Sequence, residues 1–391
     1  MGTPVTGVNP RMLVWARERA GQSVDQVADT LGKTADVIES WEAGTAAPTY
    51  PQLEALAYRV YKRPLALFFF PEPPDEPDPE HAFRTLPEFE LEDLSPDTRY
   101  KIRQALALQV SLQELNRGTN PAERKILKDL RPSQNLSAPM VAKQVRSYLG
   151  VDLLTQKSQW SSADEALKSW RQAVEEVGVY VFKNSFKQKD VSGFCLYDDE
   201  FPLIYLNNGT SKTRQIFTIF HELAHLLTQT SGVTKRDDRY IQQLTGHSKR
   251  IEIFCNQFAA EILVPADELR HLVIGRRPSD EQVGDIAARF KVSREVVLRR
   301  FLDLGLVSKA YYESKAAQWK ADYENHSAKG EGGGNYYLTQ AAYLGERYMR
   351  LAFRRYYEGS ISLDQLADYL NVRVGSVPGL EQLVLNSPER G

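Results

Sequence analysis

Two histidines and a glutamate stand close together in the segment TIFHELAHLLT, residues 218–228. His221 and His225 are four residues apart, so on a helix their imidazoles lie one turn apart on the same face. Their ring nitrogens can then bind one cation together. Glu222 lies beside that face, where its carboxylate can reach a water on the metal without being a ligand. The order H-E-x-x-H predicts a zinc site that activates water; the alternative is a pair of core histidines with satisfied hydrogen bonds.

A catalytic zinc needs a third protein ligand and one position open for water. We expect this ligand on a later helix, and Glu252 in RIEIFCNQFAAEILVP is the best candidate. The alternative is a solvated helix carboxylate beside Lys249 and Arg250. Asn256 lies four residues after Glu252, on the same helical face. It is expected to hydrogen-bond the free ring nitrogen of a ligand histidine and fix its tautomer.

The segments FHELAHLL and EIFCNQFAAEILVP are specific in combination. On these two motifs, the part of the chain from about 137 to 310 resembles the ImmA/IrrE family of zinc metallopeptidases. The resemblance implies a small zincin fold that binds Zn²⁺. It also implies that His221, His225 and Glu252 are the metal ligands and that Glu222 is the general base.

Hydrolysis of a peptide also needs a group that stabilises the oxyanion. Tyr240 and His247 lie between the two zinc helices and are the candidates, although each can equally be an ordinary loop residue. Cys255 is expected to be a small buried residue rather than a ligand. Cys195 and Cys255 are the only cysteines. Two cysteines are too few for a disulfide framework or a four-cysteine zinc site, and they suit a reducing cytoplasm.

The composition of the chain is that of an ordinary globular protein. It has 391 residues, enough for two to four domains, with 42% hydrophobic and 26% charged residues. The formal net charge of -2 gives no overall basic footprint for nucleic acid, so any DNA contact must come from a local patch. The N-terminus does not have the pattern of a signal peptide, and LALFFF is too short to span a membrane. We therefore expect a cytoplasmic protein without a membrane partner.

The helices and strands that must position these residues are predicted from the periodicity of apolar residues and from the turn residues between the runs. Short β-branched and aromatic runs, VGVYVF and GFCLYDDEFPLIYLNNG, predict strands before the H-E-x-x-H helix. A polar loop is expected from 230 to 248, and the helix with Glu252 from about 249 to 263. From 279 a second helix pair follows, which is either a packing hairpin or a DNA reader. A glycine-rich break is expected at 330–337, before a last helical piece.

Residues 9–72 have the pattern of several short helices. Ser23 and Thr34 are expected to cap the second and third helices, and Gly21 and Gly32 to end the first two. This pattern is similar to the XRE, or Cro/C1-type, helix-turn-helix. The prolines of 71–80 predict a stiff linker, and a second boundary is expected near 132–138.

The expected fold class is α+β and predominantly α. A five-helix-type helix-turn-helix domain precedes a small zincin-like domain with a short sheet, and a helical region ends the chain. The expected parts are a helix-turn-helix domain (1–72), a proline-rich linker and helical connector (73–136), a metallopeptidase domain (137–310) and a helical C-terminal region (311–391).

In a helix-turn-helix domain the third helix enters the major groove. By position, the residues expected to face bases or phosphates are Lys33, Thr34, Ala35, Asp36, Ser40 and Thr45. These are poor readers, because arginine, glutamine and asparagine make the strong base contacts. Asp36, Glu39 and Glu42 would be repelled by phosphates, and Trp41 is expected to pack in the core. The domain therefore either binds DNA, docks a protein or forms a homodimer.

Two functions from different classes remain open. The first is a zinc endopeptidase that cleaves a protein, with a helix-turn-helix repressor as the candidate substrate, in stress response, mobile-element or toxin–antitoxin control. The second is a DNA-binding transcriptional regulator or antitoxin-like protein whose zinc domain is a sensor or scaffold. The presence of Glu222 favours the first, because a purely structural zinc site needs no base.

Overall fold

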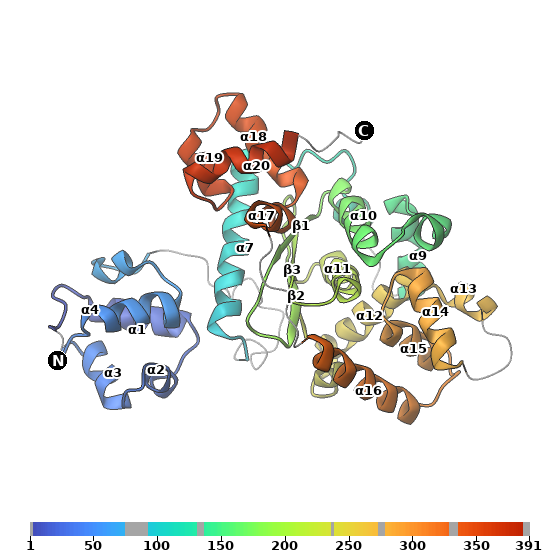
Figure 1. Cartoon of the computed structure of the whole chain (residues 1–391), viewed down its shortest axis with the longest axis horizontal. Helices are drawn as coiled ribbons and strands as arrows, with labels where there is room; N and C mark the ends of the chain where they lie inside the picture. Colours follow the sequence, from blue (N-terminus) through green and yellow to red (C-terminus); the bar gives the residue numbers. More distant parts are fainter. Residues whose placement is uncertain are drawn as a thin grey trace. The chain divides into compact units, whose positions relative to one another are not determined.

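The computed structural model describes residues 3–74, 93–130, 137–235, 238–272, 278–327 and 335–385. Contacts within the chain divide it into two compact units. Unit 1 contains residues 1–107 and 186–189, and unit 2 contains residues 108–185 and 190–391. The chain is mostly helical with one small sheet, which confirms the expected α+β, predominantly α class (Figure 1).

Several sequence predictions concern residues outside this description. Most of the expected linker at 71–80, of the boundary near 132–138 and of the break at 330–337 falls there. Among the described residues, no helix is both long enough and apolar enough to cross a membrane.

Unit 1 begins with a bundle of short helices. Their bounds are α1 (Pro10–Arg19), α2 (Val24–Leu31), α3 (Ala35–Glu42), α4 (Tyr50–Glu54), η1 (Ala55–Tyr61), which continues α4 as a π-helix, and η2 (Leu65–Phe69). Ser23 caps α2 with a reciprocal capping box to Gln26. Gly32 follows α2 with φ 63°, a left-handed conformation that glycine adopts without strain. The sharp turn into α3 gives this pair the form of a helix-turn-helix.

The sheet of unit 2 has four strands in the order β1-β3-β2-β4. They are β1 (Tyr180–Asn184), β2 (Val191–Leu196), β3 (Leu203–Asn207) and β4 (Gly232–Lys235). β1 and β3 are parallel, whereas β2 pairs antiparallel with both β3 and β4. β2 and β3 are fully buried, as expected of central strands that are covered by helices.

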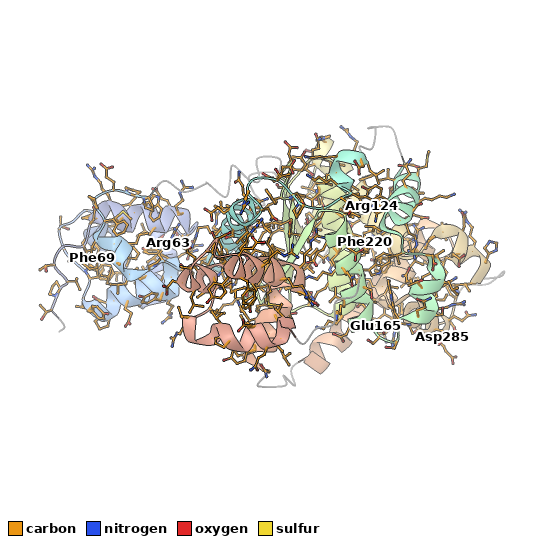
Figure 2. The ribbon with its side chains drawn as sticks, turned by 90° about the horizontal axis from the view of Figure 1, so that it is seen from above. Arg63, Phe69, Arg124, Glu165, Phe220 and Asp285 are labelled. Carbon is orange, nitrogen blue, oxygen red and sulfur yellow. The ribbon has the colours of Figure 1, made fainter. Side chains whose placement is uncertain are left out.

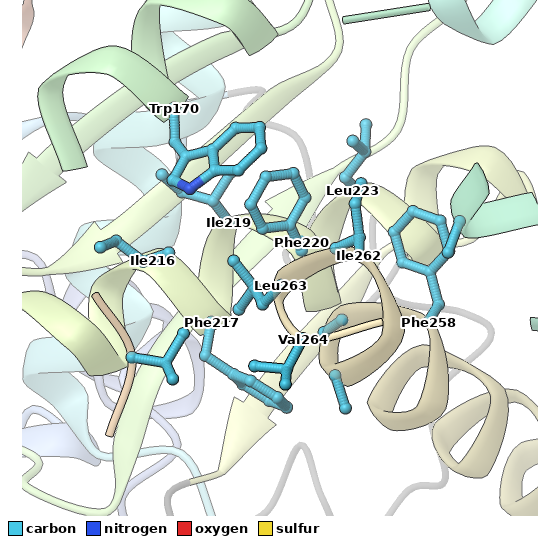
Figure 3. Packing of buried hydrophobic residues seen from close by; sticks show 14 of the residues in the cluster. Trp170, Ile216, Phe217, Ile219, Phe220, Leu223, Phe258, Ile262, Leu263 and Val264 are labelled. Atoms are coloured by element: carbon cyan, nitrogen blue, oxygen red, sulfur yellow. The ribbon is translucent and has the colours of Figure 1, made fainter. Parts of the chain in front are cut away.

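Four helices contribute much of the core of unit 2. They are α9 (Ala138–Leu149), α10 (Ala163–Glu176), α11 (Lys212–Leu227) and α12 (Gly246–Leu263). α11 lies next to the strands and contacts both α10 and α12 (Figure 1). Trp170 of α10 meets Phe220 of α11 edge to face, with ring centroids 4.8 Å apart. Figure 3 shows this pair in the apolar cluster, and Figure 2 shows Phe220 inside unit 2 with the exposed Glu165 and Asp285 farther out.

The expected polar loop at 230–248 is wrong in most of its length. It contains β4, the short helix η4 (Asp238–Gln242) and the first turn of α12, which begins at Gly246 rather than near 249. β4 is a four-residue edge strand that pairs only with β2, so its stability comes from tertiary contacts rather than from a long alternating pattern.

The remaining helices connect and extend these layers. They are α7 (Pro96–Leu115), α8 (Ile126–Asp129), η3 (Thr155–Gln159), α13 (Ala266–Leu272), α14 (Asp280–Phe290), α15 (Arg294–Asp303), α16 (Lys309–Ser327), α17 (Tyr336–Leu344), α18 (Glu346–Tyr357), α19 (Leu363–Tyr369), η5 (Val374–Ser376) and α20 (Val377–Leu385). The pair α14–α15 buries residues of both helices in the core of unit 2, Val283 and Phe290 of α14 and Val297 and Phe301 of α15, as a packing hairpin does. The last helical piece is broken at Gly345, between α17 and α18.

Candidate metal centre

Helix α11 holds the H-E-x-x-H residues in the interior of unit 2. Ser211 caps the helix by accepting a hydrogen bond from the Arg214 amide. Every residue of α11 from 215 to 227 is buried, so the helix has almost no solvated face. Glu222 is 0% exposed, and His221 and His225 are 1% and 2% exposed. Polar side chains at such depth need partners, and the partners of these three define the site.

Helix α12 crosses close to α11 and brings the third candidate ligand. Ala259 and Ala260 are buried and small, which permits a close approach of the two helices. Figure 3 shows Phe258 and Ile262 of α12 beside the apolar residues of α11. Glu252 lies six residues before Phe258 on α12 and is only 4% exposed. The two helices therefore bring the residues of both motifs together at one buried place.

The donor atoms of these residues form a compact triangle. His221 Nε2 and His225 Nε2 are 3.2 Å apart. Glu252 spans both, with Oε1 3.0 Å from His225 Nε2 and Oε2 3.3 Å from His221 Nε2. Two ligand atoms bound to one tetrahedral zinc, each at about 2.0–2.1 Å, lie about 3.3–3.4 Å apart. The three side chains therefore fit one face of a tetrahedral metal site.

Cys255 is a competing third ligand. Its Sγ and one ring nitrogen from each of His221 and His225 all lie within 4.8 Å of one another. The oxygens of Glu252 lie 3.0 and 3.3 Å from the imidazole Nε2 atoms of His225 and His221. Burial also raises the pKa of the Cys255 thiol, and a protonated thiol is a poor ligand. The charge therefore favours the carboxylate of Glu252 over the thiol of Cys255.

The carboxylate of Glu252 is held in its charged form. Burial alone would raise its pKa, but the charges and hydrogen bonds of His225 and His221 outweigh burial and hold the pKa well below its usual range. Tyr240 of η4 also donates a hydrogen bond to Glu252 Oε2. A divalent cation bound between the imidazoles would replace their protons and favour the charged carboxylate in the same way.

Two side chains orient the imidazoles from behind. Asn256 Oδ1 lies 3.0 Å from His221 Nδ1, and Thr230 Oγ1 lies 3.2 Å from His225 Nδ1. When each Nδ1 is used in this way, Nε2 keeps its lone pair for the centre of the triangle. Asn256 was expected from the sequence at this place, whereas Thr230 was not. A threonine in a turn after a helix carries no pattern that points to an imidazole.

Glu222 lies on the sheet side of the same helix. Its Oε1 accepts a hydrogen bond from Thr234 Oγ1, and the Cys195 thiol lies against the same carboxylate. Glu222 Oε2 is buried and has no hydrogen-bond partner among the described residues. Burial raises the pKa of Glu222, although His225 and His221 act in the opposite direction. One oxygen of this carboxylate is therefore anchored and the other remains able to accept a proton.

The two candidate oxyanion groups are placed differently. Tyr240 is buried and donates a hydrogen bond to Glu252, so it lies at the candidate metal centre. His247 is exposed on the first turn of α12, and no described contact joins it to the centre. Thr230, Thr234 and Cys195 were missed as neighbours of the site. Cys195 lies in a run that the sequence predicted as a strand, whereas Thr234 lies in the short GVT run, which is too brief to predict one.

The residues named for DNA contact lie on the α2–α3 pair of unit 1. Lys33, Thr34, Asp36 and Thr45 are exposed, whereas Ala35 and Ser40 are half-buried. The Ser40 hydroxyl donates to the Val37 carbonyl, and Thr45 Oγ1 donates to the Ser40 carbonyl, so both hydroxyls are used within the helix end. Trp41 is 5% exposed and packs in the core of unit 1, as expected.

Helix α3 is anchored through its acidic side. Arg17 Nε lies 2.7 Å from Glu42 Oε1, and Arg17 Nη2 lies 3.0 Å from Glu42 Oε2. This bidentate ion pair joins α1 to α3. The carboxylate of Glu42 is therefore paired and does not add to the exposed negative charge of α3. Asp36 and Glu39 remain exposed on the helix that would face a duplex.

Comparison with known proteins concerns the part of the chain that contains this centre. Residues 174–302 match the model of the Peptidase_M78 family, described as the IrrE N-terminal-like domain. The radiation response metalloprotease IrrE of Deinococcus deserti is 31% identical over 103 residues. Residues 174–302 are similar to a metallopeptidase family. The match to IrrE covers 25% of this chain and 34% of the relative, so the chain spans about a third of the relative's length.

These matches support a domain of the metallopeptidase type, which implies a metal. The family match at 174–302 includes α11 and α12 and therefore the triangle of donor atoms. The family match does not extend to α1–α4 of unit 1.

Proposed function

We propose that the chain is a zinc-dependent endopeptidase. The observation that carries the proposal is the triangle of His221, His225 and Glu252, with donor atoms 3.0 to 3.3 Å apart, beside a glutamate that has one unpartnered buried oxygen. His221, His225 and Glu252 would hold the zinc, and Glu222 would act as the general base. The similarity of residues 174–302 to a metallopeptidase family supports the same assignment.

The residues of the site divide the chemistry between them. A bound zinc ion lowers the pKa of the attacking water and polarises the scissile carbonyl. Glu222 Oε2 accepts a proton from this water as its oxygen attacks the carbonyl carbon, and later gives a proton to the leaving amine. Asn256 and Thr230 keep the two imidazoles in the orientation that ligation requires. Tyr240 fixes the carboxylate of Glu252 and is the nearer of the two candidates for contact with the substrate.

The proposed substrate is a protein, and a helix-turn-helix repressor is the candidate that the resemblance suggests. The α1–α4 bundle would then direct the peptidase to a regulatory target. Exposed Asp36 and Glu39 on α3 make strong non-specific DNA binding unfavourable, because a duplex is densely anionic. We therefore propose that this bundle recognises a protein or one specific DNA site, either as a monomer or as a homodimer.

The test combines metal content with hydrolysis. Purified protein should hold about one zinc per chain, and His221→Ala and His225→Ala should lose most of it. Glu222→Gln should keep the metal and the fold but lose hydrolysis of peptides and of candidate repressors by ~10²–10⁴-fold. Glu281→Gln, a change of an exposed glutamate on α14, is the matched control and should cleave normally. Metal retained without any cleavage would instead favour the regulator or scaffold.

A second measurement concerns the N-terminal bundle. Removal of residues 1–72 should leave metal binding intact and should reduce cleavage of the natural target more than cleavage of a short unstructured peptide. A DNA gel-shift titrated over salt should show weak binding with a shallow salt dependence, because few phosphates would be neutralised. Loss of metal on truncation, or a steep salt slope, would contradict this assignment.

A further inference from the structure

The short edge strand β4 faces the H-E-x-x-H residues of α11. Gly232 and Thr234 are two residues apart on β4, so they point to the same side of the sheet. A Cβ at Gly232 would meet the imidazole of His225, and the Thr234 hydroxyl donates to Glu222. Strand β4 therefore runs beside the two motif residues and contacts each of them with a different residue.

The contact between Thr234 and Glu222 is buried on both sides. Thr234 is 2% exposed and Glu222 is 0% exposed, so water cannot readily replace the hydroxyl. Threonine is stiff at χ1, and its backbone is fixed by pairing with Gly193 of β2. The hydroxyl is therefore offered to the carboxylate from a fixed place.

The contact leaves the two carboxylate oxygens unequal. Oε1 accepts from Thr234, while Oε2 has no hydrogen-bond partner among the described residues. The Cys195 thiol is the other polar neighbour on the sheet side, but a thiol is a weak donor. Without the threonine hydroxyl, the carboxylate could turn about its terminal bond, because that torsion is soft.

We propose that Thr234 is a positioning residue for Glu222, a role that rests on the proposed peptidase function. Its hydroxyl anchors Oε1 and so keeps Oε2 turned toward the place where water is activated. This hydroxyl donates to Glu222 and not to a candidate ligand. Removal of the hydroxyl should therefore leave the metal content unchanged. A purely structural hydroxyl would instead change stability without a selective effect on turnover.

The first test separates turnover from binding. Thr234→Val keeps the shape and removes the hydroxyl, and it should lower kcat by ~10–100-fold with an unchanged metal content and a KM within about twofold. Thr234→Ser restores the hydroxyl and should recover most of the turnover. Thr218→Val is the matched control, because Thr218 is also buried but donates to the Arg214 carbonyl of its own helix. Unchanged kcat in Thr234→Val, or a loss explained by KM or metal, would overturn the proposal.

A double variant tests the dependence on Glu222. In a Glu222→Gln background, Thr234→Val should cause no further loss of the residual rate, because residues that act as a unit are not additive. A full second loss in that background would show that Thr234 acts elsewhere. If the valine variant does not fold, Thr234→Ala replaces it, since alanine fits any space that threonine occupies.

An infrared measurement covers the case in which the wild type cleaves nothing. The carboxyl band of Glu222 is assigned as the difference between the wild type and Glu222→Gln. This band should shift in the Thr234 variant that lacks the hydroxyl and return in Thr234→Ser. An unshifted band would refute the positioning role. Absence of cleavage with a shifted band would sink the proposed function alone.

Discussion

Gly232 and His225 approach so closely that no side chain fits between them. A Cβ built on Gly232 would lie 2.7 Å from His225 Cδ2 and 2.8 Å from His225 Nε2. The backbone of β4 therefore forms one wall of the space that holds this imidazole. Glycine is needed here for space rather than for a left-handed conformation, since its φ is not positive.

The change Gly232→Ala should displace the imidazole of His225 and weaken metal binding. Disturbed ligand orientation typically costs ~10–100-fold in affinity, which competition with a chelator can measure. Gly284→Ala on α14 is the control, because the nearest atom to its added Cβ is 4.0 Å away. That variant should bind metal normally. Equal metal affinity for both variants would mean that His225 moves freely or is not a ligand.

The identity of the third ligand can be decided by a pair of substitutions. Glu252→Gln should lose most of the metal, because it removes the charged oxygen donors 3.0 and 3.3 Å from the two imidazoles. Cys255→Ser should keep the metal within a few-fold, since a protonated thiol contributes little to binding. Cobalt substitution adds a direct readout: the near-ultraviolet charge-transfer band of a thiolate ligand should be absent. The reverse pattern would assign Cys255 in place of Glu252.

Asn256 and Thr230 should matter to metal affinity without being essential. Asn256→Ala and Thr230→Val each remove one hydrogen-bond partner of a proposed ligand imidazole. Each should weaken the affinity for the metal by ~10–100-fold. Titration with a metal chelator at constant pH measures both. A loss as complete as that of Glu252→Gln would show that the residue binds the metal directly.

Lys183 of β1 should make stability depend on pH above neutrality. Burial lowers its pKa to about 7, with Arg171 and Lys212 acting in the same direction. The unfolded chain therefore binds the extra proton between about pH 7 and pH 10.5, and the lysine opposes folding most strongly at and below pH 7. As the pH rises toward 10.5 this opposition disappears.

Accordingly, Lys183→Met should stabilise the protein by about 1–4 kcal/mol at pH 6–7, and the gain should shrink as the pH approaches 10.5. Denaturant unfolding of both proteins across this range gives the difference. Lys168→Met, an exposed position on α10, should show no such trend. A gain that is constant with pH would attribute the effect to apolar packing instead.

The local elements of the site followed from the sequence because their signals are local. The spacing of His221, Glu222 and His225 places them within about one turn of a single helix. Glu252 and Asn256 share a second helix for the same reason. Periodicity over ten to twenty residues is strong enough to locate such helices and the faces that carry chemistry.

Tertiary structure alone decided what surrounds these two helices. Thr230, Gly232 and Thr234 lie in a segment that the sequence predicted as a polar loop. Thr230 meets His225 through the turn that directly follows α11. Gly232 and Thr234 instead reach His225 and Glu222 because β4 pairs with β2 and so runs along α11. The same holds for Cys195, which stands opposite Gly232 in that pairing. An edge strand of four residues has too little pattern to be recognised, and the pairing that stabilises it joins residues some forty positions apart, which local preferences do not encode.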